Sequence, residues 1–258
     1  MFGTVTVQLP AEQCGTTTRP SSLRLLHTAD LHIGDDTTQW SPDRRISGLS
    51  KVVEVAIERQ VDVVLIAGDF FDNARVKAAH IDAAWYELSR LSIPIVLTPG
   101  NHDCLGVPSI YQRTRPPESL PQIVFLGEPD GSYALLPNLG LTVWSRGLVS
   151  HDHDYYPLAG YKGRMNANWH VVMAHGYFVK EGLNEDRSSP IPEKQLAALD
   201  CDYLALGHWH DFADVSSNRT RAFYSGSPSD SFGTYSSVNL VTLDPKFGAV
   251  VERVAIDV

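Results

Sequence analysis

The chain has 258 residues, of which 43% are hydrophobic, and a composition that supports a full core and argues against a disordered or fibrous protein. No stretch approaches the roughly 18 apolar residues that span a bilayer, and the three cysteines form no paired framework, so we expect a soluble, cytoplasmic protein that does not bind membranes. The net charge of −9 argues against tight, non-specific DNA binding by this chain alone, because nucleic-acid binders usually present a basic surface to the phosphates.

The first predicted segment is a flexible N-terminal tail over residues 1–22, which are rich in Thr, Ser, Pro and Gln and lack apolar periodicity. One folded domain is expected over 23–258, because no interior linker or repeat interrupts it. Five short apolar runs in that domain end abruptly in polar residues, at 23–29, 61–67, 93–99, 169–174 and 203–206. Such runs are typical of strands that helices cover on both faces of a sheet.

Helical periodicity separates the first runs. Apolar residues recur on one face of a predicted helix over 44–60 and of a second helix that carries Ile81, Trp85 and Leu88. Pro42 is placed just outside the first helix, and a third, shorter helix is expected over 193–199. Strand, helix and strand in succession imply parallel neighbours, whose ligand site lies beyond the carboxyl ends of the strands.

The middle and the end of the chain have a different pattern. Apolar runs at 122–126, 133–136 and 139–144, separated by turn residues, predict antiparallel strands. A closing hairpin is expected from strands 238–243 and 250–256, and it favours a second sheet stacked on the first. The predicted fold class is therefore α/β, with two stacked mixed β-sheets flanked by helices.

Side chains that bind metals follow each of the five predicted buried strands. They are Asp30, His32, Asp69, Asn101, His175, His208 and His210. Metal-activated hydrolysis needs such deprotonated donors and an open coordination position for water. The mixture of nitrogen and oxygen suits Mn, Fe, Zn, Co or Ni better than Mg or Ca. We therefore predict a two-metal site in which Asp69 bridges the ions with its two carboxylate oxygens.

Three glycines, Gly68, Gly100 and Gly207, each directly precede a predicted ligand. Without a Cβ they permit an unusual backbone angle, and they let metal and substrate approach closely. We expect them to form the sharp exits from the strands.

The ordered set D-x-H, G-D-x-x-D, G-N-H-D, H-G and G-H-x-H resembles the calcineurin-like metallophosphoesterase superfamily, from about residue 24 to the C-terminus. Within it, residues 26–32, 67–72 and 206–210 are most similar to the SbcD-type nuclease subunits of DNA double-strand-break repair. The resemblance implies one ion held by Asp30, His32, Asp69 and His210. It implies a second ion held by Asp69, Asn101, His175 and His208, with manganese as the first choice for both.

The same resemblance implies two catalytic residues. His102 would contact the scissile phosphate or protonate the leaving oxygen, and Asp72 would orient its imidazole. The expected substrate is a phosphodiester, including nucleic-acid ends. We see no capping domain of the SbcD kind and no helical segment for docking, so the sequence does not indicate a partner ATPase.

Two alternatives stay open. The same site could act on a phosphomonoester, a nucleotide or a cyclic nucleotide, which the acidic net charge and the missing capping domain favour. A non-catalytic metal-binding scaffold is the alternative from another class. The complete ligand set and His102 argue against a scaffold, which needs no acid for a leaving group.

The other histidines are interpreted as structural. His27 and His170 lie inside strand runs and His80 on a helix, so we expect them to pack in the core or on a helix. His151 and His153 have the spacing of a ligand pair, but no buried strand precedes them, which favours a solvated loop.

A few polar and aromatic residues near the motifs remain. Asp103 is expected to cap the following turn or to support His102. Asp35 and Asp36 are expected in an exposed loop. Trp209, between two predicted ligands, and Tyr224 are candidates to face the cleft, and the sequence assigns them no role.

Overall fold

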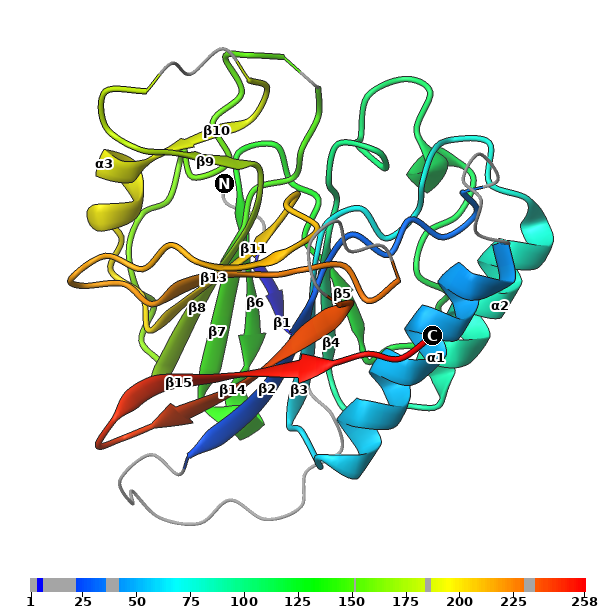
Figure 1. The fold of residues 1–258 in the computed structure, drawn as a ribbon, viewed down its shortest axis with the longest axis horizontal. Helices are drawn as coiled ribbons and strands as arrows, with labels where there is room; N and C mark the ends of the chain where they lie inside the picture. The colour runs from blue at the N-terminus through cyan, green and yellow to red at the C-terminus, as the bar shows by residue number, and fades with distance from the viewer. Residues whose placement is uncertain (1–3, 7–21, 36–41, 151, 184–186, 230–234) are drawn as a thin grey trace.

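The computed structural model of the protein describes residues 4–6, 22–35, 42–150, 152–183, 187–229 and 235–258. Two β-sheets lie face to face, with helices on their outer sides (Figure 1). The predicted α/β fold with two stacked mixed sheets is confirmed. Among the helices in these ranges, none is long and apolar enough to cross a membrane.

The first sheet has six strands in the order β15-β14-β2-β3-β4-β5. Their bounds are β2 Leu23–Thr28, β3 Val63–Ala67, β4 Ile95–Thr98, β5 Ile123–Phe125, β14 Ser237–Asp244 and β15 Gly248–Ala255. Strands β2 to β5 are parallel, and the closing hairpin of β14 and β15 pairs antiparallel with β2.

Two predictions about this sheet are wrong. The sequence pattern predicts an antiparallel β5, which instead runs parallel to β4, and the closing hairpin extends the first sheet instead of the second. The reason is that the apolar pattern of a strand reports which of its faces are buried, whereas the pairing partner depends on where the whole chain returns.

The second sheet has seven strands in the order β1-β6-β7-β8-β11-β13-β12. Their bounds are β1 Thr4–Thr6, β6 Ser132–Leu136, β7 Leu141–Ser145, β8 Trp169–His175, β11 Tyr203–Gly207, β12 Phe212–Asp214 and β13 Ala222–Ser225. β6 and β7 are antiparallel as predicted, whereas β7, β8, β11 and β13 run parallel. A separate parallel pair joins β9 (Tyr177–Val179) and β10 (Pro190–Pro192).

Strand β1 lies within the expected N-terminal tail. It pairs parallel with β6 at the edge of the second sheet. A three-residue edge strand needs only backbone hydrogen bonds on one side, so the composition of the segment carries no signal for it. The other residues of the expected tail, apart from Ser22, lie outside the described residues.

The helices cover the outer faces of both sheets. α1 (Pro42–Glu58) and α2 (Ala78–Ser89) pack on the first sheet, and α3 (Glu193–Ala197) lies on the second (Figure 1). Two short 3-10 helices complete the elements, η1 (Ile110–Gln112) and η2 (Pro137–Leu139). α1 includes Pro42, which the sequence analysis places just outside it, because proline suits the first turn of a helix.

The strands alternate between two cores. Along β3, Val64 and Ile66 pack toward α1 and α2, whereas Val63 and Leu65 pack between the sheets. Because both faces of the strand are buried, every residue of β3 is apolar. The first polar residue after β3 is Asp69, where the chain has left the sheet.

Candidate metal centre

The seven predicted ligands come from the carboxyl ends of strands in both sheets. Asp30 and His32 follow β2, Asp69 follows β3, Asn101 follows β4, His175 ends β8, and His208 and His210 follow β11. Because the two sheets are stacked with these ends at one rim, side chains far apart in the sequence meet there. The structure brings all seven together in two overlapping groups.

One group surrounds Asn101. Its Oδ1 atom lies 2.9 Å from His175 Nε2 and 2.9 Å from His208 Nδ1. The Oδ2 atom of Asp69 lies 3.2 Å from the same nitrogen of His175. These atoms are donors of the kind that bind a transition metal, and all of them converge on one point.

The other group surrounds His32. Its Nε2 atom lies 3.2 Å from His210 Nε2 and 3.8 Å from Asp69 Oδ2. Ligand atoms of Asp30, His32 and His210 all lie within 4.8 Å of one another. His32 Nδ1 lies 3.3 Å from Asp72 Oδ1 and faces it as a donor, which leaves a lone pair on Nε2 toward the group.

The donor chemistry of the Asn101 group fits a cation. His175 Nδ1 donates to the carbonyl oxygen of Ala67 at 2.9 Å, so its Nε2 atom directs a lone pair at two oxygen acceptors. Acceptors that face one another at this distance repel unless a positive charge lies among them. Burial opposes charging of His175, but Asp69 raises the pKa of His175 to about 9. Without metal, a proton on Nε2 takes the place of this lone pair and supplies the positive charge that a metal ion would otherwise bring.

Asp69 joins the two groups. Its Oδ1 atom accepts the backbone amide of His102 at 2.8 Å, so the other oxygen alone faces both His175 and His32. The sequence analysis predicts one oxygen toward each ion, and the amide of His102 is the reason that one oxygen faces both groups. Burial opposes ionisation of this carboxyl, but the neighbouring imidazoles hold its pKa well below the usual range.

His102 and Asp72 lie beside these groups. His102 Nδ1 donates to the backbone oxygen of Asp72 at 3.0 Å and lies 3.3 Å from its Oδ1. The hydrogen bond to the side-chain carboxylate of Asp72 raises the pKa of His102 to about 9. The His102 side chain is 44% exposed, so its Nε2 edge is open to an incoming ligand while Nδ1 is fixed.

Asp103 has a role that the sequence does not reveal. Its Oδ2 atom accepts the backbone amides of Phe70 and Phe71 and the hydroxyl of Tyr111, and its Oδ1 atom accepts the amide of Gly100. The buried carboxyl thus ties the loop after β3 to the loop after β4. The prediction of a cap or a support for His102 is replaced by this link between two ligand-bearing loops.

The backbone at the ligands is unusual. Asp30, His32, Asp69 and His208 all have positive φ, a region that L-residues seldom occupy outside constrained sites. Among the three motif glycines, Gly68 alone has positive φ. At Gly100 and Gly207 an added Cβ would overlap Asp69 and Ala67, so these glycines are needed because protein atoms approach closely.

The histidines outside the motifs lie where the sequence analysis expects them, as far as the structure describes them. His27 is buried in β2 with Nδ1 2.9 Å from the hydroxyl of Tyr203, and His170 is buried in β8, as predicted for structural histidines. His153 is exposed in a loop as predicted, and His151 lies outside the described residues.

The prediction of an exposed loop at Asp35 is wrong. Asp35 is 4% exposed, and its Oδ2 atom accepts from Arg45 Nη2 at 2.9 Å. The Arg45 side chain of α1 is itself buried, and a buried guanidinium requires a paired carboxylate. Asp36 lies outside the described residues.

Comparisons with known proteins identify the family of the chain. The family model of the calcineurin-like phosphoesterases matches residues 23–212. The SbcD subunit of the nuclease SbcCD from Bacillus subtilis is 26% identical over 245 residues, which covers 80% of this chain and 61% of that protein. The protein of the same name from Rhodobacter capsulatus is 37% identical over 87 residues, or 31% of this chain and 22% of that protein.

Among solved structures, a dimetal phosphatase from Danio rerio has the same fold, with a TM-score of 0.55 and 10% identity over 91% of this chain and 99% of that one. The chain spans about three fifths or less of the length of the two curated relatives named above. The match to the family model covers well over half of the chain and includes all seven predicted ligands. The chain therefore belongs to the calcineurin-like phosphoesterase family.

Proposed function

We propose that the protein is a binuclear metal-dependent phosphodiesterase. Asp30, His32, Asp69 and His210 would hold one ion, and Asp69, Asn101, His175 and His208 would hold the other. The observation that carries the proposal is the position of Asp69 Oδ2, which lies 3.2 Å from His175 Nε2 and 3.8 Å from His32 Nε2 and thus belongs to both groups. A carboxylate shared by two groups of donors is what a pair of neighbouring ions requires.

When bound, divalent ions would lower the pKa of water and neutralise charge on the phosphate. His102 supplies the proton. Its Nδ1 atom is occupied by Asp72, which leaves Nε2–H of the protonated ring to donate to the leaving oxygen. In the metal-free chain the carboxylate of Asp72 raises the pKa of His102 to about 9, which favours the protonated form that a general acid requires.

Manganese is the proposed physiological metal, with Fe, Zn, Co or Ni as alternatives, because imidazole and carboxylate together suit these ions. Nucleic-acid ends are the proposed substrates, since the curated relatives are named as nuclease subunits. The name of these relatives describes one subunit of a nuclease. We therefore include a partner subunit for this chain in the same proposal. A small phosphomonoester or nucleotide is the second candidate, which the net charge of −9 favours.

The test is turnover of a bis-aryl phosphate and a mono-aryl phosphate by protein loaded with each metal, followed by single-stranded and duplex DNA. We expect the bis-aryl ester to be cleaved faster. The reverse ranking would favour the monoesterase, and no turnover with any of the five metals would leave a non-catalytic scaffold.

A further inference from the structure

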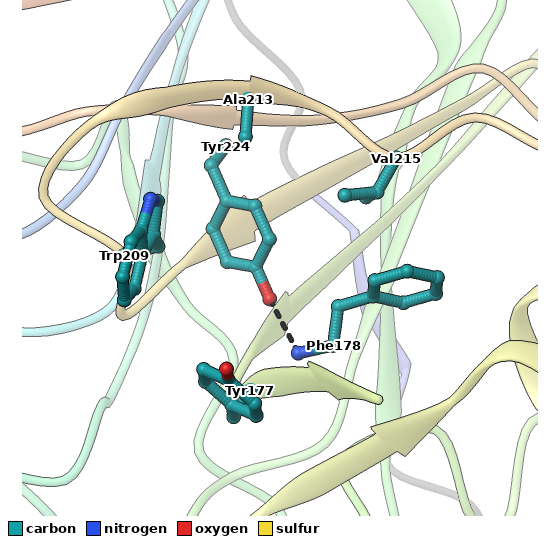
Figure 2. Close-up of a pocket in the computed structure, with 6 residues that line it drawn as sticks. All are labelled: Tyr177, Phe178, Trp209, Ala213, Val215 and Tyr224. Atoms are coloured by element: carbon teal, nitrogen blue, oxygen red, sulfur yellow. Dashed lines mark hydrogen bonds between the residues drawn. The ribbon is translucent and has the colours of Figure 1, made fainter. Parts of the chain in front are cut away.

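An aromatic pocket lies directly beside the proposed metal centre. It is lined by Tyr177, Phe178, Trp209, Ala213, Val215 and Tyr224 and encloses about 140 Å³ (Figure 2). Trp209 lies in the sequence between His208 and His210, and Tyr177 follows His175 by two residues. The Tyr177 ring is 6.5 Å from the His208 ring and 6.3 Å from the Trp209 ring, between centroids. Two residues that line the pocket, Tyr177 and Trp209, are therefore neighbours of the proposed ligand His208.

One side of the pocket is formed by the ring of Tyr224, which two hydrogen bonds hold in place. Tyr224 is buried, and its hydroxyl donates to the carbonyl oxygen of Gly176 at 2.7 Å and accepts from the amide of Phe178 at 2.8 Å. Figure 2 shows this ring between Trp209 and Phe178. Because both hydrogen bonds are internal, Tyr224 offers a ring to an occupant and keeps its polar atom for the protein.

The pocket is open to solvent, and a cation lies next to one of its lining residues. Trp209 is 43% exposed, so a large indole stands partly in water next to the metal centre. The guanidinium of Arg187 lies 4.5 Å from the centre of the Tyr177 ring. An exposed aromatic surface with a neighbouring cation suits a ligand that combines a flat ring with negative charge.

We propose that the aromatic pocket binds a nucleobase of the substrate next to the scissile phosphate. An apolar cavity of roughly 150 Å³ holds a benzene-sized ring, so this pocket has room for one ring of a base, and the rest of the base would lie at its open side against Trp209. Base stacking on aromatic side chains tolerates any sequence, because every base has a flat face. The substrate class is thereby a nucleotide diester, an inference that rests on the proposed phosphodiesterase function.

The first test compares kcat/KM for a dinucleotide with kcat/KM for two analogues in which one base or the other is replaced by hydrogen. Loss of one of the two bases should lower kcat/KM about 10- to 100-fold in the natural protein. Trp209→Ala should lower kcat/KM on the intact dinucleotide and abolish the difference between substrates. Tyr86→Ala, which removes an exposed aromatic side chain of α2, should keep the difference.

The metal content of Trp209→Ala is measured in parallel, because Trp209 lies between two proposed ligands. If that variant loses metal, Tyr177→Leu replaces it in the same comparison. Equal cleavage of the intact and base-free substrates by the natural protein would overturn the inference, and so would a base effect that survives both substitutions.

The second test measures binding without turnover. Zinc-loaded protein is titrated with a nucleoside 5′-monophosphate and with deoxyribose 5-phosphate, and tryptophan fluorescence is recorded at once after mixing. The nucleotide should quench the tryptophan fluorescence, and deoxyribose 5-phosphate should not. Trp209→Phe should remove the quenching but keep the base preference in turnover. Quenching that survives in Trp209→Phe, or equal effects of the two ligands, would contradict the pocket.

The two proposals fail in different ways. If aryl diesters are cleaved but the base has no effect, the phosphodiesterase stands and the pocket falls. If no diester is cleaved, the phosphodiesterase falls, and the fluorescence titration alone decides whether the pocket binds a base.

Discussion

His175 and Ala67 join the two sheets at the metal centre. The Nδ1 atom of His175, at the end of β8, donates to the carbonyl oxygen of Ala67, at the end of β3, over 2.9 Å. This bond fixes which nitrogen of the imidazole faces Asn101 and Asp69, and it crosses from one sheet to the other. The stacking of the sheets and the chemistry of the site are therefore coupled through one hydrogen bond.

Gly207→Ala should disturb that bond. An added Cβ would lie 2.0 Å from the carbonyl oxygen of Ala67 and 2.8 Å from His175 Nδ1. We expect metal affinity to fall about 10- to 100-fold and stability by about 1–3 kcal/mol. Isothermal titration with zinc and urea unfolding measure the two effects. Gly182→Ala is the control. Among the described residues, its two chain neighbours aside, no atom lies within 4 Å of the added Cβ, so the backbone angle is the main cost.

Asp69→Ala should empty both sites, because one oxygen of Asp69 faces both groups of ligands. Metal analysis of the purified variant should find less than one ion per chain under conditions that load the natural protein with two. Asp82→Ala, on an exposed position of α2, should bind as the natural protein does. Full occupancy of one site in Asp69→Ala would argue against a shared ligand.

His102→Ala should keep its metal and lose turnover by about 10² to 10⁴, the range for a general acid. His102 is placed beside the ligand groups, with its Nδ1 atom bonded to Asp72. Steady-state kinetics and metal content are measured on the same sample. His153→Ala, in an exposed loop, is the matched control. A variant that loses metal together with activity would show that His102 acts as a ligand.

Asp72→Asn should lower turnover by about 10- to 100-fold, less than the loss of His102 itself, because Asp72 acts by orienting another residue. Its Oδ1 atom lies 3.3 Å from His102 Nδ1 and 3.3 Å from His32 Nδ1, so the substitution weakens the support of both imidazoles. In the double variant with His102→Ala, the further loss from Asp72→Asn should be small. Full additivity of the two losses would contradict an effect that passes through His102.

Acid should destabilise the metal-free protein through His27. Burial lowers the pKa of His27 from 6.5 to about 3. The unfolded chain therefore binds a proton below about pH 6.5 while the folded chain does not, and stability falls as the pH drops from 6.5 toward 3. Between pH 7 and pH 5 this group should cost about 2 kcal/mol.

The measurement is urea unfolding in EDTA at pH 7 and pH 5. In His27→Gln the substituted side chain does not titrate. The loss of stability between pH 7 and pH 5 should therefore be smaller than in the natural protein by about 2 kcal/mol. His153→Gln, at an exposed position, should change with pH as the natural protein does. An unaltered pH dependence in His27→Gln would place the acid sensitivity elsewhere.

The buried strands and the residues that follow them could be predicted because the signals are local. A run such as Val63–Ala67 is apolar at every position, since both of its faces are buried. The chain becomes polar where it leaves the sheet. The histidines inside strands were also predictable from their neighbours. β1 was missed because three edge residues carry no burial pattern.

The pairing of strands was predicted less well. β5 and the closing hairpin have the apolar patterns expected of strands, but those patterns are compatible with either sheet. The same limit applies to single side chains. The residues around Asp35 in the sequence do not show that Arg45 is buried beside it. Those around Asp103 do not show that two loops meet at its carboxyl group.

The sequence by itself determined the donors of the site, their order and their place at strand ends, because residue type and hydrophobic pattern are properties of short segments. Only the tertiary structure decided that ends from two different sheets meet at one rim, that a single oxygen of Asp69 faces both ligand groups, and that an aromatic pocket adjoins His208. Those relationships depend on how distant segments pack, and packing is a property of the whole chain.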